Sequence, residues 1–292
     1  MTAVQLEPGL RRITAPNPSP MTLEGTNTFL VGQRDLAVID PGPLSDSHLA
    51  AILAAVGHDQ RISHILVTHS HLDHSPLARA LSRATGAPVL AAGDSAWGRS
   101  PAMQALAEEG LIGGGEGVDP DFAPDRALAD GEVLEADGWQ IEVLHTPGHM
   151  ANHVSFASNG VLFSGDLVMG WSTSLISPPD GDLTAFRNSL DRLLARTDRV
   201  YHPAHGEPVT DPAGRCRELL DHRAGRERQI LAALAEAPAT PAALTARIYT
   251  DIDARLLPVA ERNVLAHLID LVERKLAEPA NSLSATGQFR AL

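Results

Sequence analysis

The chain has 292 residues, of which 43% are hydrophobic, and a formal net charge of −13. This length allows one large domain and a smaller one, and the acidic balance argues against a general nucleic-acid-binding surface, which is usually basic. No run of about 18 apolar residues is present, so we expect no membrane-spanning segment. Residues 1–12 lack the apolar stretch of a signal peptide, and Cys216 is the single cysteine. These features predict a cytoplasmic location and no internal disulfide.

Strands and helices alternate in the first part of the chain. We expect strands at 36–39, 65–67 and 88–91, with helices at 47–57 and 76–86 between them. This order is typical of an α/β layer architecture. Four short strands then follow, at 132–134, 139–144, 153–158 and 161–164, and the last two are predicted to form a hairpin on Asn159-Gly160.

The last third of the chain is predicted to be mainly helical. Asp182 caps a helix that runs to about residue 196, a strand at 199–201 follows, and a long helix runs from about 212 to 237. Two shorter helices, at 241–248 after the cap Thr240 and at 258–276, complete what we interpret as a small helical or winged-helix-like module.

Two segments have no clear periodic pattern. Residues 93–130 contain Gly113-Gly114-Gly115, and we favour a solvated insertion over a flexible flap for them. We expect the last residues, 278–292, to be poorly ordered.

The most informative segment is Thr68-His69-Ser70-His71-Leu72-Asp73-His74, which directly follows the strand predicted at 65–67. Imidazoles and a carboxylate buried without partners would cost roughly 1–3 kcal/mol each. A divalent metal would remove that cost and would provide a Lewis acid. The segment therefore predicts a metal site whose remaining ligands lie elsewhere in the chain.

Four further candidates each follow a predicted strand. They are Asp40, His149 in His145-Thr146-Pro147-Gly148-His149, Asp166 in Ser164-Gly165-Asp166, and His205 in His202-Pro203-Ala204-His205-Gly206. Strand ends at one edge of a sheet layer bring distant residues together, and glycine or proline beside each candidate favours a sharp turn. Imidazole and carboxylate form a ligand set that accepts zinc, iron or manganese.

The ordered set resembles the metallo-β-lactamase fold hydrolases over roughly residues 22–210. All five motifs of that family occur in order, at Asp40, His69 to His74, His149, Asp166 and His205. The resemblance implies an α/β fold, namely a four-layer αβ/βα sandwich with a two-metal site at one edge.

The tail is similar to the beta-lactamase-like protein 2 group. The similarity rests on His222-Arg223-x-x-Arg226-Glu227-x-Gln229-Ile230 and on the helices that follow it. In that group a winged-helix-like C-terminal domain follows the hydrolase. We therefore predict a catalytic domain at 1–212, and a long connecting helix with a winged-helix-like module at 213–292.

The resemblance also implies a role for each candidate ligand. His69, His71 and His149 would hold one metal, Asp73, His74 and His205 would hold the second, and Asp166 would bridge both. We expect two divalent ions, with zinc as the default and iron or manganese as alternatives. Two such ions would share a water and lower its pKa from about 15.7 towards about 7. Asp73 would be the catalytic residue that orients the hydroxide and moves its proton, and Asp40 would hold a ligand imidazole.

Three classes of function compete. The first is a dinuclear metal hydrolase in which the metal-bridging hydroxide attacks the carbonyl of a small ester, thioester or lactone. The second is a metal-dependent endoribonuclease, because relatives in the beta-lactamase-like protein 2 group cleave single-stranded RNA, although the acidic charge argues against this partner. The third is a metal-stabilised binding scaffold without activity. β-Lactam hydrolysis is less favoured, because the bridging position carries aspartate, as in glyoxalase II-like enzymes, instead of cysteine. The sequence does not define an oligomeric state.

Several other side chains near the motifs have two interpretations each. His145, His153 and His202 are either structural histidines or partners of the site. Trp171 is either an apolar wall of the substrate pocket or part of a half-buried loop. Arg223 either fastens the long helix to the catalytic domain or presents its charge to a substrate.

Overall fold

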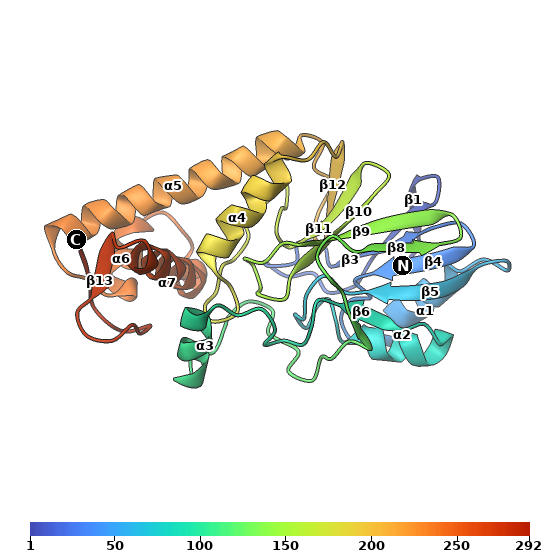
Figure 1. Cartoon of the computed structure of the whole chain (residues 1–292), viewed down its shortest axis with the longest axis horizontal. Helices are drawn as coiled ribbons and strands as arrows, with labels where there is room; N and C mark the ends of the chain where they lie inside the picture. Colours follow the sequence, from blue (N-terminus) through green and yellow to red (C-terminus); the bar gives the residue numbers. More distant parts are fainter.

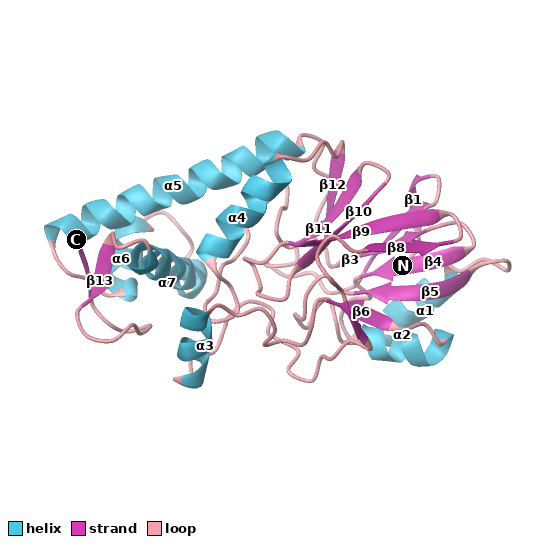
Figure 2. Ribbon diagram, viewed as in Figure 1, coloured by secondary structure: helices cyan, strands magenta, loops and turns pink.

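Two β-sheets stacked face to face occupy one half of the protein, on the right in Figure 1, and helices cover both outer faces. The computed structural model describes residues 1–292. The first sheet has seven strands in the order β1-β2-β3-β4-β5-β6-β7, and the second has five in the order β12-β11-β10-β9-β8. In Figure 2 the strands of both sheets lie on the right, and most of the helices lie on the left.

The first sheet is built from the N-terminal part of the chain. Its strands are β1 (Val4–Glu7), β2 (Leu10–Thr14), β3 (Asn27–Val31), β4 (Asp35–Ile39), β5 (Arg61–Leu66), β6 (Val89–Ala91) and β7 (Arg126–Ala127). The helices between these strands are α1 (Asp46–Ala54), α2 (Leu77–Thr85) and α3 (Pro101–Glu108). β4 to β7 pair in parallel, so their carboxyl ends lie along one edge of the sheet.

The second sheet follows in the chain. Its strands are β8 (Val133–Ala136), β9 (Trp139–His145), β10 (Val154–Ser158), β11 (Val161–Gly165) and β12 (Val200–Pro203), and α4 (Leu183–Leu194) connects the last two. The predicted hairpin is present, because β10 and β11 pair antiparallel across Asn159 and Gly160, which both have positive φ angles as a type I′ turn requires. Asp182 caps α4 as predicted and accepts a hydrogen bond from the amide of Ala185.

Three apolar clusters hold the layers together. The cluster between the sheets includes Phe29, Ile39, Leu66, Val143, Phe156 and Phe163. A second cluster packs the first sheet against α1 and α2, and a third packs the second sheet against α4 and the following helix. Helix, sheet, sheet and helix therefore form four layers, which confirms the sandwich predicted from the motifs.

The C-terminal part begins with the long helix α5 (Pro212–Glu236), which extends away from the sheets (Figure 1). It is followed by α6 (Pro241–Ile248), a 3-10 turn η1 (Ala254–Leu256), α7 (Leu257–Glu273), β13 (Ala277–Pro279) and β14 (Phe289–Ala291). α5 contributes Cys216 and Leu219 to the third cluster and Ile230 and Leu234 to a separate C-terminal core. The boundary at 212 stays a prediction, because this helix belongs to both cores.

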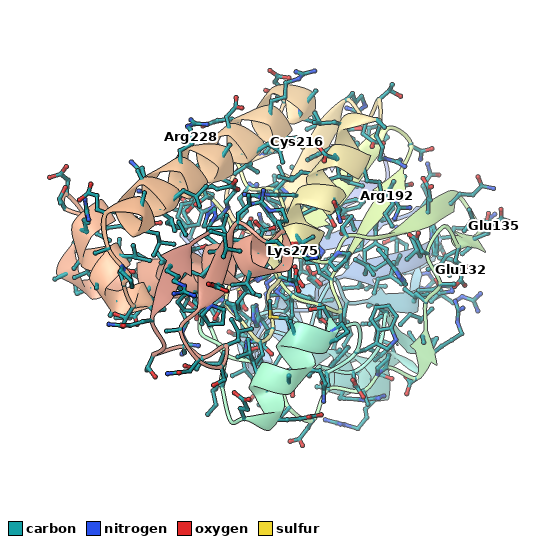
Figure 3. All side chains as sticks on the ribbon, turned by 60° about the vertical axis from the view of Figure 1, so that its left-hand side comes forward. Glu132, Glu135, Arg192, Cys216, Arg228 and Lys275 are labelled. Atoms are coloured by element: carbon teal, nitrogen blue, oxygen red, sulfur yellow. The ribbon has the colours of Figure 1, made fainter.

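Cys216 lies on α5 (Figure 3) and its side chain is fully buried. Burial raises the pKa of its thiol to about 12, so the thiol is neutral and inert at physiological pH. No helix of the protein combines the length and the hydrophobicity needed to cross a bilayer.

The two segments without a periodic pattern differ in outcome. Residues 93–130 are mostly exposed or half-buried, as expected of a solvated insertion, but they also form α3 and β7 and bury Phe122 and Leu128. Residues 278–292 are not poorly ordered, since β13 and β14 pair antiparallel and Phe289 is fully buried. Both segments are stabilised by contacts with distant parts of the chain, which a local pattern does not reveal. The strands β1 to β3 were likewise not predicted.

The packing of β14 generates a prediction. Replacing Phe289 by alanine removes a fully buried ring from the C-terminal core, so we expect the free energy of unfolding to fall by about 3–5 kcal/mol. The neighbouring change Arg290→Ala alters an exposed side chain and should cost less than about 0.5 kcal/mol. Urea unfolding followed by circular dichroism measures both, and equal midpoints for the two variants would contradict this packing.

Candidate metal centre

The candidate ligands lie where five strands end at the same edge of the sandwich. Asp40 follows β4, the segment His69 to His74 follows β5, and His149 follows β9. Asp166 and His205 follow β11 and β12 in the same way. Gly148, with φ 149°, lies in the turn before His149. Only glycine fits at this position, because a Cβ there would lie 2.4 Å from the Cα of Phe186. Residues that are more than 130 positions apart therefore meet in one place.

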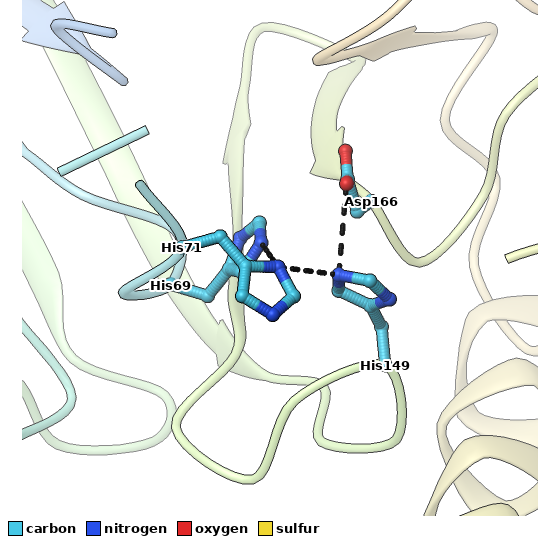
Figure 4. Close-up of side chains that lie close together, drawn as sticks. All are labelled: His69, His71, His149 and Asp166. Atoms are coloured by element: carbon cyan, nitrogen blue, oxygen red, sulfur yellow. Dashed lines mark hydrogen bonds and ion pairs between the residues drawn. The ribbon is translucent and has the colours of Figure 1, made fainter. Parts of the chain in front are cut away.

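Four side chains form the first group: His69, His71, His149 and Asp166. His71 Nδ1 lies 2.9 Å from His69 Nε2 and 3.0 Å from His149 Nε2 (Figure 4). The Oδ2 of Asp166 lies 3.6 Å from His149 Nε2. A tetrahedron with metal–nitrogen bonds of about 2.0–2.1 Å has edges of about 3.3 Å, so the spacing of these nitrogens suits a common metal.

Asp73, His74 and His205 form the second group. Asp73 Oδ2 lies 3.2 Å from His74 Nε2 and 3.1 Å from His205 Nε2. Asp166 also reaches this group, with Oδ2 3.6 Å from His74 Nε2 and Oδ1 3.3 Å from His205 Nε2. The carboxylate of Asp166 thus lies between the two groups, and all seven predicted residues are brought together.

The outer nitrogens of three imidazoles donate hydrogen bonds to oxygen atoms. His74 Nδ1 donates to Asp40 Oδ2 at 3.0 Å, and His149 Nδ1 donates to the carbonyl of Leu175 at 2.7 Å. His205 Nδ1 donates to the carbonyl of Gly25 at 3.2 Å. Because these oxygens only accept, each Nδ1 carries a proton, and Nε2 is the nitrogen that faces the centre.

The donor set fits bound metal ions. Asp73 Oδ1, His74 Nε2 and Asp166 Oδ1 are buried and have no hydrogen-bond partner within the protein. Each buried polar atom without a partner costs about 1–3 kcal/mol, and more when the group is charged. Divalent cations would compensate these atoms, and imidazole with carboxylate suits zinc, iron or manganese.

The electrostatics keep the carboxylates ionised. Burial works to raise the pKa values of Asp73 and Asp166, but the neighbouring histidines outweigh it and hold both pKa values well below their usual range. Burial, with His149 nearby, lowers the pKa of His71 to about 3. Burial also opposes a charge on His205, but Asp166 and Asp73 prevail and raise its pKa to about 10.

The other histidines near the motifs have structural partners. His153 Nε2 accepts a hydrogen bond from the amide of Asp166 at 3.2 Å, and its Nδ1 lies 3.0 Å from Thr146 Oγ1. The ring of His153 therefore supports the backbone of Asp166. His145 Nε2 donates to the carbonyl of Leu128 at 2.9 Å. The ring of His202 stacks on Phe163, with centroids 5.8 Å apart. None of these three belongs to either group of candidate ligands.

A narrow cleft of about 50 Å³ opens onto both groups. Its lining consists of Pro20, Met21, His71, Asp73, Gly115, Glu116, His149, Asp166, Met169, Trp171, Ser172, Thr173, Leu175 and His205. Trp171 packs over Gly206, where a Cβ would lie 2.7 Å from the indole ring. Trp171 thus lines the cleft from a half-buried loop, and its role as an apolar wall for a substrate stays a prediction.

Sequence reasoning missed several residues of the site. Thr26 Oγ1 donates to Asp73 Oδ2 at 3.3 Å, and Ser19 Oγ donates at 2.8 Å to Glu116, which lines the cleft. The segment with Glu116 also pairs with the histidine motif, since the amide of Leu72 donates to the carbonyl of Gly117. These residues lie in loops without a motif or a periodic pattern, so the sequence carries no signal for them.

Comparisons with known proteins agree with this geometry. Residues 21–205 match the family described as "Metallo-beta-lactamase superfamily", and residues 240–282 match the "Beta-lactamase associated winged helix domain". The Beta-lactamase-like protein 2 homolog of Drosophila melanogaster is 31% identical over 275 residues, which cover 89% of this chain and 86% of that protein. The atrochrysone carboxyl ACP thioesterase of Aspergillus chevalieri is 32% identical over 241 residues, which cover 80% of this chain and 68% of that protein.

A solved structure shows the same fold over nearly the whole chain. The beta-lactamase domain protein from Burkholderia ambifaria superimposes with a TM-score of 0.82 at 22% identity, covering 99% of this chain and 93% of that one. The chain belongs to the metallo-beta-lactamase superfamily, carries the associated winged-helix domain, and is a hydrolase of that superfamily. The resemblance read from the motifs is confirmed.

The central location of Asp166 leads to a prediction about metal content. The parent protein, purified and loaded with zinc, should contain about two metal ions per chain, because two groups of ligands share this carboxylate. Asp166→Ala should lose at least one of them, and elemental analysis measures the ratio. His58→Ala is the control, since it removes an imidazole that is 99% exposed and far from the site. Unchanged metal content in Asp166→Ala would exclude the bridging role.

Proposed function

We propose that the protein is a dinuclear metal-dependent hydrolase that cleaves a neutral thioester, ester or lactone with an apolar acyl group. The observation that carries this proposal is the cleft itself. Its floor is made of buried carboxylates and imidazoles, its walls include Met21, Met169, Trp171 and Leu175, and it contains no arginine or lysine. Such a cleft suits an uncharged acyl group next to a strongly polar reaction centre.

The ligand assignment follows the two groups. His69, His71 and His149 would hold one ion, Asp73, His74 and His205 would hold the other, and Asp166 would contact both. We propose zinc as the ion, with iron and manganese as alternatives, because the donors are imidazole and carboxylate. When bound, two such ions supply a Lewis acid and lower the pKa of a coordinated water from about 15.7 to about 7.

Asp73 is the proposed catalytic side chain. Its Oδ2 accepts a hydrogen bond from Thr26 and lies 3.1–3.2 Å from His205 and His74, whereas its Oδ1 has no hydrogen-bond partner and the residue lines the cleft. Oδ1 is therefore the atom that would orient the attacking water and accept its proton. The same proton would then pass to the sulfur or oxygen of the leaving group, so that the acyl carbon gains a hydroxyl group and the products are an acid and a thiol or alcohol.

The charge of the cleft disfavours a polyanionic substrate. RNA recognition depends on cationic contacts to phosphates, and none of the 14 lining residues is arginine or lysine. Arg215 lies near the cleft but does not line it. Its guanidinium donates to the carbonyls of Met169 and Ser172 and so stabilises the loop that carries Trp171. Glu116 adds a carboxylate to the cleft. Endoribonuclease activity is thus the second candidate, and β-lactam hydrolysis is less favoured still.

The relatives support the acyl substrate, since one of them is a thioesterase by name. The proposed substrate of this chain is accordingly a small molecule or an acyl group on a carrier, cleaved at the thioester carbonyl. The cytoplasmic location and the domain boundary at residue 212 stay predictions from the sequence.

A panel of substrates distinguishes the candidate reactions. The zinc-loaded protein is assayed with short-chain and long-chain acyl thioesters, an aryl ester, a lactone, a β-lactam and single-stranded RNA. We expect turnover of the long-chain thioester or the ester, because apolar side chains form part of the cleft wall, and no turnover after chelation, because the reaction centre needs the metals. Strong RNA cleavage without turnover of any thioester, ester or lactone would reverse the ranking.

Trp171 allows a sharper test of the acyl-binding wall. Trp171→Ala removes an apolar wall of the cleft, so kcat/KM for a long-chain thioester should fall by about 10-fold or more, and less for an acetyl thioester. Trp97→Ala is the matched control, since Trp97 is 41% exposed against 38% for Trp171 but packs on His145 away from the cleft. Equal effects of the two changes on long-chain turnover would argue against an acyl group on this wall.

A further inference from the structure

The C-terminal module contacts the loop that forms one wall of the cleft. Asn263 of α7 accepts a hydrogen bond from the amide of Ile176 at 3.2 Å and another from Arg223 Nη1 at 2.9 Å. Arg223 of α5 in turn donates through Nη2 to the carbonyl of Ser174. The two side chains therefore hold the loop on both sides of Leu175.

Leu175 connects this loop to the metal centre. Its carbonyl accepts the proton of His149 Nδ1 at 2.7 Å, and its side chain lines the cleft. Ser174 and Ile176 are 1% and 0% exposed, so the loop has no freedom to seek other partners in solvent. The orientation of the His149 ring thus depends on a carbonyl whose two neighbouring residues are fastened by α5 and α7.

Arg223 carries a charge and is nevertheless buried. The residue is 2% exposed, its guanidinium carbon lies 5.3 Å from the centroid of the Phe186 ring, and its Nε has no hydrogen-bond partner. Buried charges are costly unless hydrogen bonds compensate them. The carbonyl of Ser174 and the amide oxygen of Asn263 provide these bonds, which excludes Arg223 as a group that meets substrate.

The same helix also holds the opposite wall. Arg262, next to Asn263 in α7, donates to the carbonyls of Ile112 and Pro178. The amide of Gly114 donates to Ser177 Oγ at 2.8 Å, and the two residues that follow Gly114 line the cleft. Consecutive residues of α7 therefore reach both segments that enclose the reaction centre.

We propose that the winged-helix module is part of the active site, and that Asn263 and Arg223 are positioning residues for His149, acting through Leu175. The inference rests on the proposed function in so far as His149 is a metal ligand. Substrate does not touch these two residues. Their role is to keep the Leu175 carbonyl on His149 Nδ1, so that Nε2 stays unprotonated and directed at the metal.

The test compares four full-length variants. Asn263→Ala removes the acceptor oxygen, whereas Asn263→Asp keeps it and can still accept from Ile176 and Arg223. Arg223→Met removes the donor to Ser174 at similar volume. Arg187→Ala is the matched control, because Arg187 joins α4 to Asp270 and Glu227 of the module and has no bond to the loop.

Two readouts are measured on each variant. The first is the dissociation constant of zinc, obtained by competition with a chromogenic chelator. The second is the tautomer of His149 in the metal-free protein, obtained from ¹⁵N imidazole shifts. We expect about 10-fold or greater weakening of zinc binding and loss of a uniform Nδ1–H tautomer in Asn263→Ala and Arg223→Met. Asn263→Asp and Arg187→Ala should resemble the parent in both.

Three results would overturn the proposal. They are parent-like zinc affinity and tautomer in Asn263→Ala, equal weakening in Arg187→Ala, and failure of Asn263→Asp to rescue. If the parent bound no metal, the proposed function would fall, and the tautomer measurement would decide the positioning role by itself. If the parent bound two ions and Asn263→Ala did so equally well, the function would stand and the positioning role would fail.

Discussion

The catalytic edge depends on one electrostatic constraint, which is the burial of two carboxylates among five imidazoles. Asp73 is 4% and Asp166 7% exposed, and both face His74 and His205 at 3.1–3.6 Å. Ions out of water are stable only when other charges or hydrogen bonds compensate them. Side chains that follow the strands ending at this edge compensate part of the buried negative charge, and bound metal ions would compensate the rest.

Three of the imidazoles are oriented by hydrogen bonds from their Nδ1 atoms to distant parts of the chain. Asp40 holds His74, Gly25 holds His205 and Leu175 holds His149, each through an oxygen that accepts from Nδ1. Outer partners of this kind orient metal ligands and set their tautomers. Because the Leu175 loop is itself fastened by Arg223 and Asn263, the electrostatic constraint extends into the C-terminal module. The winged-helix domain is thereby linked to the chemistry without entering the cleft.

Most elements from β4 to α7 and the seven candidate ligands were predictable because their signals are local. A short apolar run followed by a polar, glycine-containing turn marks a strand end, and the caps at Asp182 and Thr240 mark helix starts. The segment 93–130 and the final strand were not predictable. Their order comes from pairing with distant backbone, as between Leu72 and Gly117 or between Ala239 and Phe289, and no short window of sequence records such a partner.

The sequence by itself determined the chemistry, because imidazole and carboxylate side chains in this spacing have few stable uses other than holding metal ions. It also determined the family, since the motifs occur in a fixed order along the chain. Only the tertiary structure decided what surrounds that chemistry. The absence of arginine and lysine from the cleft, the place of Trp171 in its lining and the contact of α7 with the Leu175 loop all arise where segments remote in sequence pack together. The physical reason is that the chemistry of a ligand is fixed by its own side chain, whereas the shape and charge of a pocket depend on which distant segments pack around it.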